Sequence, residues 1–455
     1  MRQLLTKVED SLDVLLLFTQ NVAKFSVYEL DSTCQDPRNQ KLLFSTHKST
    51  NHPIKAVVDH ANNNLQRFSE YGLYAAQEKS HTNEIDLTVT NNAVSTKKWV
   101  IHSRDSCHET YEYASKYPEE GLLPYCSLAF SLDNKDTKAT RAVDGRLFCF
   151  LPLPIQNHLP AHVNASFKIN KDRLGLKYHT EDEKNFSFEQ EDWNDLISKD
   201  IGHAYYAILL FFKQKGISFD NFYNLFPNHT DVVKERFSII CLAKLLQLCY
   251  EADDAIFPVN KDLWKTWENL RIFDSTVPKV IIGSCISLMN WYFDSMNMQC
   301  CCLRLPLNFE ALLHRFQFYE NLTSLNWDYV IEVMSQQMSN PDFPTQSRNQ
   351  IIIHLLEERK LDKTKLVHQP CIPTKPNGKL RRPDELVYEE SKVSKLYNVT
   401  DEVFLDDQFM KFQNYLKSLG MKTEFLSLAM LIDRAKSIEK AVSYTHLTLP
   451  TKRIV

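Results

Sequence analysis

Two nearby segments set the architecture that we expect of this chain: GRLFCFLPLP at residues 145–154 and HLPAHVNASFKI at residues 158–169. Apolar and polar residues alternate along the second segment, with Val163, Ala165, Phe167 and Ile169 on one face and His162, Asn164, Ser166 and Lys168 on the other. This alternation predicts a half-buried β-strand. The first segment is apolar and ends in prolines, which cannot donate to a sheet ladder. It therefore predicts a second, paired strand that leads into a stiff extended connector.

Helix and strand patterns on both sides extend this pair into a domain. Apolar residues at helical spacing predict an amphipathic helix within residues 1–20, and short apolar runs predict strands at 25–30, 99–101 and 125–132. Residues 31–95 are polar, with one predicted helix near 56–71, and are either part of the domain or a mobile loop. The first 180 residues are therefore expected to form an α+β domain with a mostly antiparallel sheet.

After residue 190 the apolar residues recur with the period of a helix. A long helix is predicted from Asp192 to Lys215, ended by Gly216, and another from Thr230, a favourable cap, to Glu251. Shorter helices are predicted around residues 309–319, 327–338, 346–358, 408–419 and 425–438. The second half is thus expected to be mainly α-helical, with one segment at 181–300 and another at 301–442.

The two opening segments resemble the sacsin repeat, a large unit that follows a Bergerat-type ATP-binding module in sacsin-like proteins. Residues 145–154, followed by Leu159-Pro160 and His162-Val163-Asn164, carry this resemblance. Further matches follow in the family's order: LLLFTQNV at 15–22, WNDL at 193–196, CIPTKPNGKL at 371–380 and RAKSI at 434–438. Where the family usually has Asn-Gly-Phe-Phe, this chain has residues 164–167 as Asn-Ala-Ser-Phe, which would alter any close backbone approach made by that glycine.

The resemblance implies a non-enzymatic chaperone or co-chaperone segment of a large, cytoplasmic, multi-repeat protein. Such a segment would work with heat-shock chaperones, including the seventy-kilodalton class, on misfolded or cytoskeletal client proteins. Two alternatives stay open. The chain is either the regulatory half of a split ATPase, in which Arg146 or Lys168 reaches the γ-phosphate of a nucleotide bound upstream of Met1, or an architectural spacer.

The glycine content argues against catalysis by this chain alone. Only nine glycines are present, and the closest two, Gly202 and Gly216, are fourteen residues apart. This spacing excludes the dinucleotide-binding, P-loop and nucleophile-elbow motifs, which need clustered glycines. The ATP-binding signatures of the Bergerat fold are also missing from the sequence. We therefore expect no enzymatic activity and no cofactor in this chain; ATP would act only through an upstream module.

Charge and hydropathy restrict the partners. The formal net charge is -4, with acidic and basic residues interspersed, so we expect no nucleic-acid binding. The longest nearly uncharged apolar stretch, Val280 to Phe293, is shorter than the roughly 18 residues needed to cross a bilayer. The amino terminus also lacks the pattern of a signal peptide. No membrane insertion and a cytoplasmic location are therefore expected.

The cysteines and histidines do not predict a metal site. The eleven cysteines have no regular spacing and no Cys-x-x-Cys motif, so buried, reduced thiols are expected, the triplet at 300–302 included. His158 and His162 are separated by Pro160 and cannot form the one-face pair of a helical zinc site. A ligand-binding or catalytic role for His162 is the less favoured alternative to a structural one.

The residues that remain are candidates for interaction. Arg146, His162, Asn164 and Lys168 are polar members of the opening motif, and pairing of Arg146 with a sheet neighbour is its favoured structural alternative. The most basic cluster lies in a loop at 373–386, where Gly378 permits a tight turn. This cluster is interpreted either as a solvated loop or as a contact for an acidic partner, and consists of Lys375, Lys379, Arg381 and Arg382.

The ends of the chain carry two expectations. Residues 443–455 break the preceding helical pattern and resemble a translated cloning or sequencing adaptor, so they are excluded from the fold. The family's unit normally begins before Met1 and continues beyond residue 442, so the chain is expected to be a fragment of a much larger protein.

Overall fold

A computed structural model describes residues 2–9, 11–29, 40–49, 54–72, 79–91, 93–133, 143–178, 192–227, 235–259 and 263–423, and parts of 428–439. The chain forms two compact units. The first comprises Met1–Leu270 and Leu305–Thr323, and the second comprises Arg271–Arg304 and Ser324–Val455.

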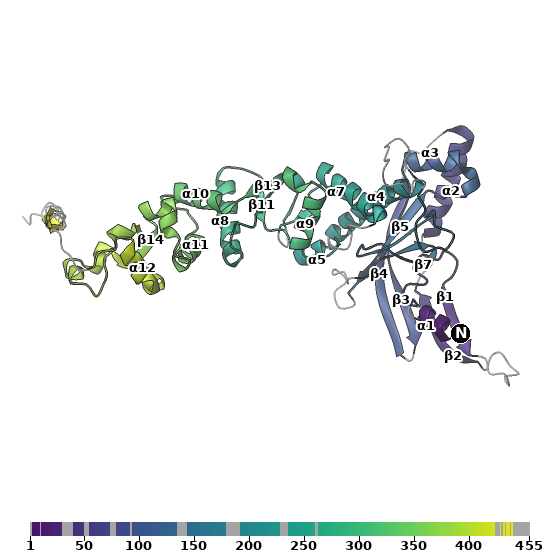
Figure 1. The fold of residues 1–455 in the computed structure, drawn as a ribbon, viewed down its shortest axis with the longest axis horizontal. Coiled ribbons are helices and arrows are strands. Elements are labelled where there is room, and N and C mark those ends of the chain that lie inside the picture. Colours follow the sequence, from purple (N-terminus) through teal and green to yellow (C-terminus); the bar gives the residue numbers. More distant parts are fainter. Residues whose placement is uncertain are drawn as a thin grey trace, which may run out of the picture. The chain divides into compact units, whose positions relative to one another are not determined.

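An eight-stranded sheet dominates the first unit (Figure 1). Its strand order is β1-β2-β3-β4-β5-β8-β6-β7, and all neighbours are antiparallel except β6 and β8. The predicted α+β class with a mostly antiparallel sheet is therefore confirmed. The strands are β1 (Lys24–Glu29), β2 (Lys41–Lys48), β3 (Ser80–Asn91), β4 (Ala93–Asp105), β5 (Tyr125–Leu132), β6 (Arg146–Cys149), β7 (Leu151–Gln156) and β8 (His162–Ala165).

The longest strands, β3 and β4, form one regular hairpin. It runs from Ser80 opposite Arg104 to Asn91 opposite Ala93. The mobile-loop alternative for residues 31–95 is wrong for the described part of that region, which contains β2, β3 and the start of β4. Threonine, serine and asparagine occupy many positions of these strands, so the apolar alternation that reveals a strand is weak there.

The first opening segment forms a hairpin at one edge of the sheet. β6 ends before Phe150, whose backbone has the left-handed φ of 62°, and the chain returns antiparallel as β7. β7 is an edge strand, where Pro152 and Pro154 are tolerated because one side of the strand needs no ladder hydrogen bonds. The predicted stiff connector is therefore itself a strand.

The second opening segment lies inside the sheet. β8 pairs in parallel with β6, with Leu147 opposite Val163, and antiparallel with β5. All four of its residues are buried, including His162 and Asn164, and the strand ends at Ala165. The prediction of a half-buried strand that continues to Ile169 is thus wrong, because other elements cover both faces of β8.

Helical segments cover both faces of the sheet. On one face, α2 (Ile54–Tyr71) and the turns at residues 11–18 pack against Trp99 and Ala129. On the other, α4 (Trp193–Gln214) packs against β4 and β5, where the ring of Phe130 lies 5.3 Å from that of Tyr205 and 6.0 Å from that of Phe212. This double cover explains why every residue of β5 is buried. The bounds of α4 agree closely with the prediction, and Gly216 follows with a φ of 72°.

The remaining helices of the first unit are short, apart from α7. The predicted helix at 1–20 is limited to α1 (Arg2–Glu9) and is followed by turns. The described part of the next long helix is α7 (Arg236–Glu251), and Thr230 lies outside the described residues. The others are α3 (His108–Lys116), α5 (Phe219–Tyr223) and α9 (Leu307–Arg315).

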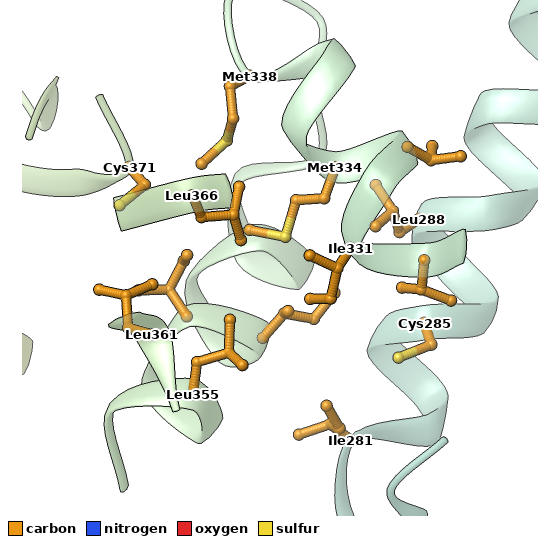
Figure 2. Packing of buried hydrophobic residues seen from close by; sticks show 14 of the residues in the cluster. Ile281, Cys285, Leu288, Ile331, Met334, Met338, Leu355, Leu361, Leu366 and Cys371 are labelled. Atoms are coloured by element: carbon orange, nitrogen blue, oxygen red, sulfur yellow. The ribbon is translucent and has the colours of Figure 1, made fainter. Parts of the chain in front are cut away.

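The second unit has its own hydrophobic core (Figure 2). Buried side chains of Cys285 and Leu288 from α8, Met334 from α10 and Leu355 from α11 contribute to it. Tertiary burial of this kind supplies most of the stability of such short helices. The helices are α8 (Ile282–Ser295), α10 (Trp327–Gln337), α11 (Thr345–Glu357) and α12 (Gln413–Ser418).

Small sheets interrupt the region that was predicted as helical. Their strands have two to four residues, too few for a period to be visible in the sequence. They are β9 (Phe257–Pro258) with β10 (Trp264–Lys265); β12 (Cys301–Leu303), β11 (Leu270–Phe273) and β13 (Thr323–Leu325); and β15 (Lys379–Arg381), β14 (Ile372–Lys375) and β16 (Phe404–Leu405).

The two compact units differ from the predicted segments 1–180, 181–300 and 301–442. Since α4 packs on the large sheet and α7 packs on α4, both helices group with the sheet. The predicted segment boundaries stay predictions, and residues 443–455 lie outside the described residues. No described helix is long and apolar enough to cross a membrane.

Candidate functional site

The candidate site is built around Gly145, whose backbone lies directly against the stretch at residues 157–161. An added Cβ would lie 2.0 Å from Oδ1 of Asn157, 2.3 Å from the carbonyl oxygen of Leu159 and 2.4 Å from that of Ala161. Only glycine therefore fits at this position.

Asn157 links the two stretches of backbone by hydrogen bonds. Its Nδ2 donates to the carbonyl oxygens of Arg146 at 3.2 Å and Ala161 at 3.1 Å, and its backbone N–H donates to the carbonyl oxygen of Gly145 at 2.9 Å. No role for Asn157 is predicted from the sequence. The available signal was Gly145 itself, the first residue of the motif in a glycine-poor chain.

Asn164 joins the β6–β7 hairpin to β5. Its Oδ1 accepts a 2.7 Å hydrogen bond from the backbone N–H of Phe150, and its Nδ2 donates to the hydroxyl of Tyr125 at 3.0 Å. The Tyr125 ring stacks on Phe150, with centroids 5.7 Å apart. Burial is the main cause of the strongly raised pKa of Tyr125. These contacts give Asn164 a structural role in fixing the hairpin. The next residue, Ala165, is buried in the β5–β8 ladder opposite Cys126, so alanine is accommodated where the family usually has glycine.

His162 is 4% exposed, and only one of its two ring nitrogens has a hydrogen-bond partner among the described residues. Its Nδ1 accepts a 3.1 Å hydrogen bond from the backbone N–H of Arg146, which leaves Nε2 as the protonated nitrogen of the neutral ring. The ring packs against Trp99 and Phe148, at centroid distances of 5.3 and 5.5 Å. Burial lowers the pKa of His162 to about 4, so the ring is neutral at pH 7. Nε2–H has no partner among the described residues.

Arg146 lines two cavities. The larger, about 540 Å³, is lined by Arg146 together with Gln156, His158, Leu174, Glu235 and residues of β7. The smaller, about 180 Å³, is lined by Arg146 and His162 together with Asp13, Val14, Lys97, Trp99, Val143 and Asp144. The guanidinium of Arg146 forms no hydrogen bond or ion pair with any described residue, so the predicted pairing with a sheet neighbour is not observed.

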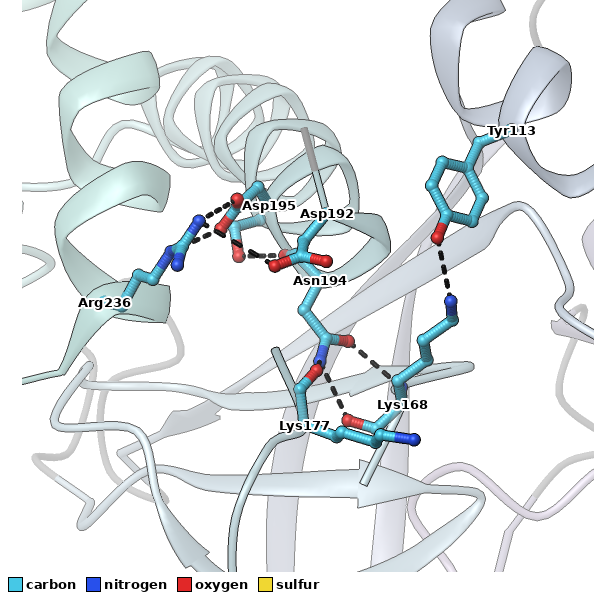
Figure 3. Close-up of polar contacts among 8 residues, drawn as sticks. Tyr113, Lys168, Lys177, Asp192, Asn194, Asp195 and Arg236 are labelled. Atoms are coloured by element: carbon cyan, nitrogen blue, oxygen red, sulfur yellow. Dashed lines mark hydrogen bonds and ion pairs between the residues drawn. The ribbon is translucent and has the colours of Figure 1, made fainter. Parts of the chain in front are cut away.

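Lys168 has internal partners (Figure 3). Its Nζ donates to the hydroxyl of Tyr113 at 2.8 Å and forms an ion pair with Glu120. Its backbone N–H donates to Oδ1 of Asn194 at 3.0 Å, and Nδ2 of Asn194 donates to the carbonyl oxygens of Lys168 and Lys177, both at 2.8 Å. These bonds tie the end of the motif to the start of α4.

A second polar contact anchors the same end of α4 (Figure 3). Nε of Arg236 on α7 donates to Oδ1 of Asp195 at 2.9 Å, and Nη2 contacts the other carboxylate oxygen. The Asp195 side chain is 8% exposed and that of Arg236 is 26% exposed. Burial raises the pKa of the Asp195 carboxyl, and the neighbouring Arg236 opposes that rise. The pair is a structural link between two helices.

The basic cluster of the second unit is neutralised by acidic neighbours. Lys375 forms ion pairs with Glu389 at 2.8 Å and Asp407 at 3.4 Å, and Lys379 pairs with Glu402 at 3.2 Å. Gly378 makes the β14–β15 turn with a φ of 71°, as expected. The remaining two residues are also engaged: Arg381 donates to the carbonyl oxygens of Asp401 and Glu402, and Arg382 pairs with Asp384 and Glu385.

The predicted interaction residues thus fall into three groups. Arg146, His162 and Asn164 lie together at β6 and β8, whereas Lys168 faces Tyr113 and Glu120. The basic cluster belongs to the second unit. Sequence analysis missed Lys97 and Asp13, which reach the smaller cavity from β4 and the turns at 11–18; no local motif marks them.

The cysteines of the triplet at 300–302 are all buried, at or next to β12. Burial raises the pKa of the Cys302 thiol, as it does for Cys241, Cys249 and Cys285. High thiol pKa values disfavour the reactive thiolate. Within the described residues there is no group of three or more histidine, cysteine or acidic side chains placed to hold a metal ion.

Comparison with known proteins agrees with the motif. Over 354 residues the chain is 25% identical to sacsin from Homo sapiens. The matched region is 72% of this chain and 7% of the length of sacsin. The resemblance to a sacsin-like protein is therefore confirmed. No family model matches the chain. No solved structure matches it either.

Proposed function

We propose that this chain is a non-enzymatic chaperone or co-chaperone segment of a larger sacsin-like protein. It acts in the cytoplasm with heat-shock chaperones, including the seventy-kilodalton class, on misfolded or cytoskeletal clients. It needs no cofactor and binds no nucleic acid. The observation that carries the proposal is the similarity to human sacsin, which spans most of this chain but a small part of that protein.

The contacts of the motif residues support a non-enzymatic role. Asn164 is used to fix the β6–β7 hairpin, and Lys168 is used to join the motif to α3 and α4. The pKa of His162 is held near 4, far below the range in which a histidine serves as an acid or base at neutral pH.

A candidate client surface lies on the edge of the sheet. β1 pairs only with β2, so one side of its backbone lacks a strand partner among the described residues. Tyr28 and Leu42 are direct cross-strand neighbours and are 47% and 41% exposed. An edge strand with exposed apolar side chains can accept an extended segment of an unfolded client as an additional strand.

The test is light scattering of a heat-denatured client mixed with the chain. We expect suppression of aggregation at near-stoichiometric ratios without ATP, and transfer of the client to the seventy-kilodalton chaperone when that protein and ATP are added. The double variant Tyr28→Ser, Leu42→Ser should suppress aggregation less, because it removes the exposed apolar pair.

The matched control is the double variant Val280→Ser, Leu307→Ser, which removes two residues that are 81% and 63% exposed elsewhere. It should behave as the wild type. A folded wild-type chain that leaves aggregation unchanged would contradict the chaperone proposal and favour the spacer alternative.

The split-ATPase alternative is supported by one observation, the unpartnered guanidinium of Arg146 among the described residues. Lys168, the other predicted candidate, is engaged by Tyr113 and Glu120. If an upstream module binds ATP, Arg146→Gln should lower its hydrolysis rate while nucleotide binding is retained. An unchanged rate would remove this alternative.

A further inference from the structure

The smaller cavity beside the motif contains hydrogen-bond donors that the fold leaves unused. His162 is almost fully buried and lines this cavity, and its Nδ1 accepts a hydrogen bond from the backbone N–H of Arg146, while Nε2–H has no partner among the described residues. This N–H is therefore available to a ligand that enters the cavity.

Arg146 supplies a second set of donors at the same place. Its guanidinium has five N–H groups in a planar fork, which matches the geometry of a carboxylate or phosphate. No described residue accepts from it, and it lines both cavities.

The acidic residues of the cavity do not satisfy these donors. Asp13 is paired with Lys97, and Asp144 is exposed and forms no ion pair with a described residue. Among the charged groups that line the cavity, two are cationic and two are acidic, and the His162 ring is neutral. The cavity is therefore not a general attractor of anions, and its selectivity comes from the placement of its donors.

From this geometry we infer that Arg146 and His162 form a binding site for the oxyanion group, carboxylate or phosphate, of a small ligand. The guanidinium of Arg146 binds two oxygens, and Nε2–H of His162 donates to one of them. Lys97 lies at the same cavity, where its charge is paired with that of Asp13. The site belongs to this chain alone and rests neither on chaperone activity nor on an upstream nucleotide module.

The test is isothermal titration calorimetry of the whole chain with acetate, propionate, inorganic phosphate and ADP as separate probes. We expect at least one of them to bind with a stoichiometry of one. Preference for acetate or propionate would identify a carboxylate ligand, whereas preference for phosphate would identify a phosphate ligand. ADP tests for a nucleotide as the source of the phosphate. Failure of all four to bind at millimolar concentration would overturn the inference.

Arg146→Gln removes the guanidinium but keeps the backbone contacts of residue 146. It should weaken binding about tenfold or more, because a charge-assisted hydrogen bond is lost. Arg315→Gln, at an exposed position of α9, is the matched control and should bind as the wild type. Equal binding by wild type and Arg146→Gln would overturn the inference, provided that the two chains have the same thermal unfolding midpoint.

A spectroscopic measurement tests the role of His162 without altering it. In the chain labelled with nitrogen-15 histidine, the ligand should shift the Nε2 signal of His162 and leave its Nδ1 signal in place. The signal is assigned by its loss in His162→Gln. Bound ligand without a shift at Nε2 would exclude His162 from the site.

Discussion

Asn164 and Phe150 are joined by a 2.7 Å hydrogen bond from the backbone N–H of Phe150 to Oδ1 of Asn164. Phe150 has a φ of 62°, a left-handed conformation that is unfavourable for an aromatic residue. The buried amide thus stabilises the residue where the chain reverses from β6 to β7.

Asn164→Ala should destabilise the chain by about 3 kcal/mol, because it removes one buried and one partly buried hydrogen bond and leaves the Tyr125 hydroxyl without its Asn164 partner. Urea denaturation measures the change in free energy of unfolding. Asn62→Ala, at an exposed position of α2, is the control and should stay within about 0.5 kcal/mol of the wild type. Equal effects of the two changes would contradict the structural role of Asn164.

Gly145→Ala tests the close backbone approach beside the motif. The new Cβ would lie 2.0 Å from Oδ1 of Asn157 and within 2.4 Å of two carbonyl oxygens, so backbone must move. We expect a loss of more than about 3 kcal/mol in the free energy of unfolding, or failure to fold.

Gly283→Ala provides a matched control for that change. A Cβ at Gly283, in α8, would meet no atom within 4 Å. Alanine has the higher helix propensity, so stability should rise by up to about 1 kcal/mol. If the Gly145→Ala chain were as stable as the Gly283→Ala chain, the backbone at residue 145 could not lie as close to Asn157 as the structure shows.

The elements that were predictable are those whose signal is local. α4 has 22 residues of helical pattern and a glycine stop, and β5 is a mostly apolar run interrupted by Ser127 and Ser131, so both could be located from the sequence. The environment of β8 could not be predicted, because its burial depends on parallel pairing with β6 and on packing by distant segments. The short strands β11 to β16 gave no readable period.

The same limit applies to the candidate site. The motif identified Arg146, His162 and Asn164 because they are close in sequence. It did not identify Lys97 and Asp13, which lie on other elements and reach the cavity only through the tertiary packing of the chain. The basic cluster at 375–382 was predicted to be a solvated loop or a contact for an acidic partner. Its acidic partners within the chain could not be predicted, because they come from residues up to 32 positions away.

Burial of His102 predicts that stability depends on pH. Burial lowers the pKa of His102 from 6.5 to about 4. The side chain is 3% exposed, and its buried Nε2 has no hydrogen-bond partner among the described residues. The unfolded chain binds the proton more readily than the folded chain. Stability from this residue is therefore complete above pH 6.5 and is lost as pH falls from 6.5 toward 4, by up to about 3 kcal/mol.

His102→Leu should remove this part of the pH dependence. The slope of unfolding free energy against pH, measured by urea denaturation at several pH values between 4 and 6.5, should decrease. The decrease should correspond to about one proton fewer taken up on unfolding. The residual slope has a contribution from His162, whose pKa is also lowered to about 4 by burial. An unchanged slope would indicate that His102 is protonated in the folded chain.

Asp195→Asn tests the link between α4 and α7. The change keeps the size of the side chain but removes the charge that faces Arg236, whose Nε lies 2.9 Å from Oδ1. Because Arg236 is 26% exposed, water can solvate part of its charge after the change, and we expect a loss of about 2 kcal/mol in the free energy of unfolding rather than the larger cost of a fully buried unpaired charge.

The control for this change is Asp59→Asn, at an exposed position of α2, which should alter stability by less than about 0.5 kcal/mol. Arg236→Gln combined with Asp195→Asn separates the pair from its parts: if the ion pair itself is stabilising, the double variant should lose less than the sum of the two single losses. Additive losses would mean that Asp195 and Arg236 act independently and that the start of α4 is held mainly by Asn194 and its bonds to Lys168 and Lys177.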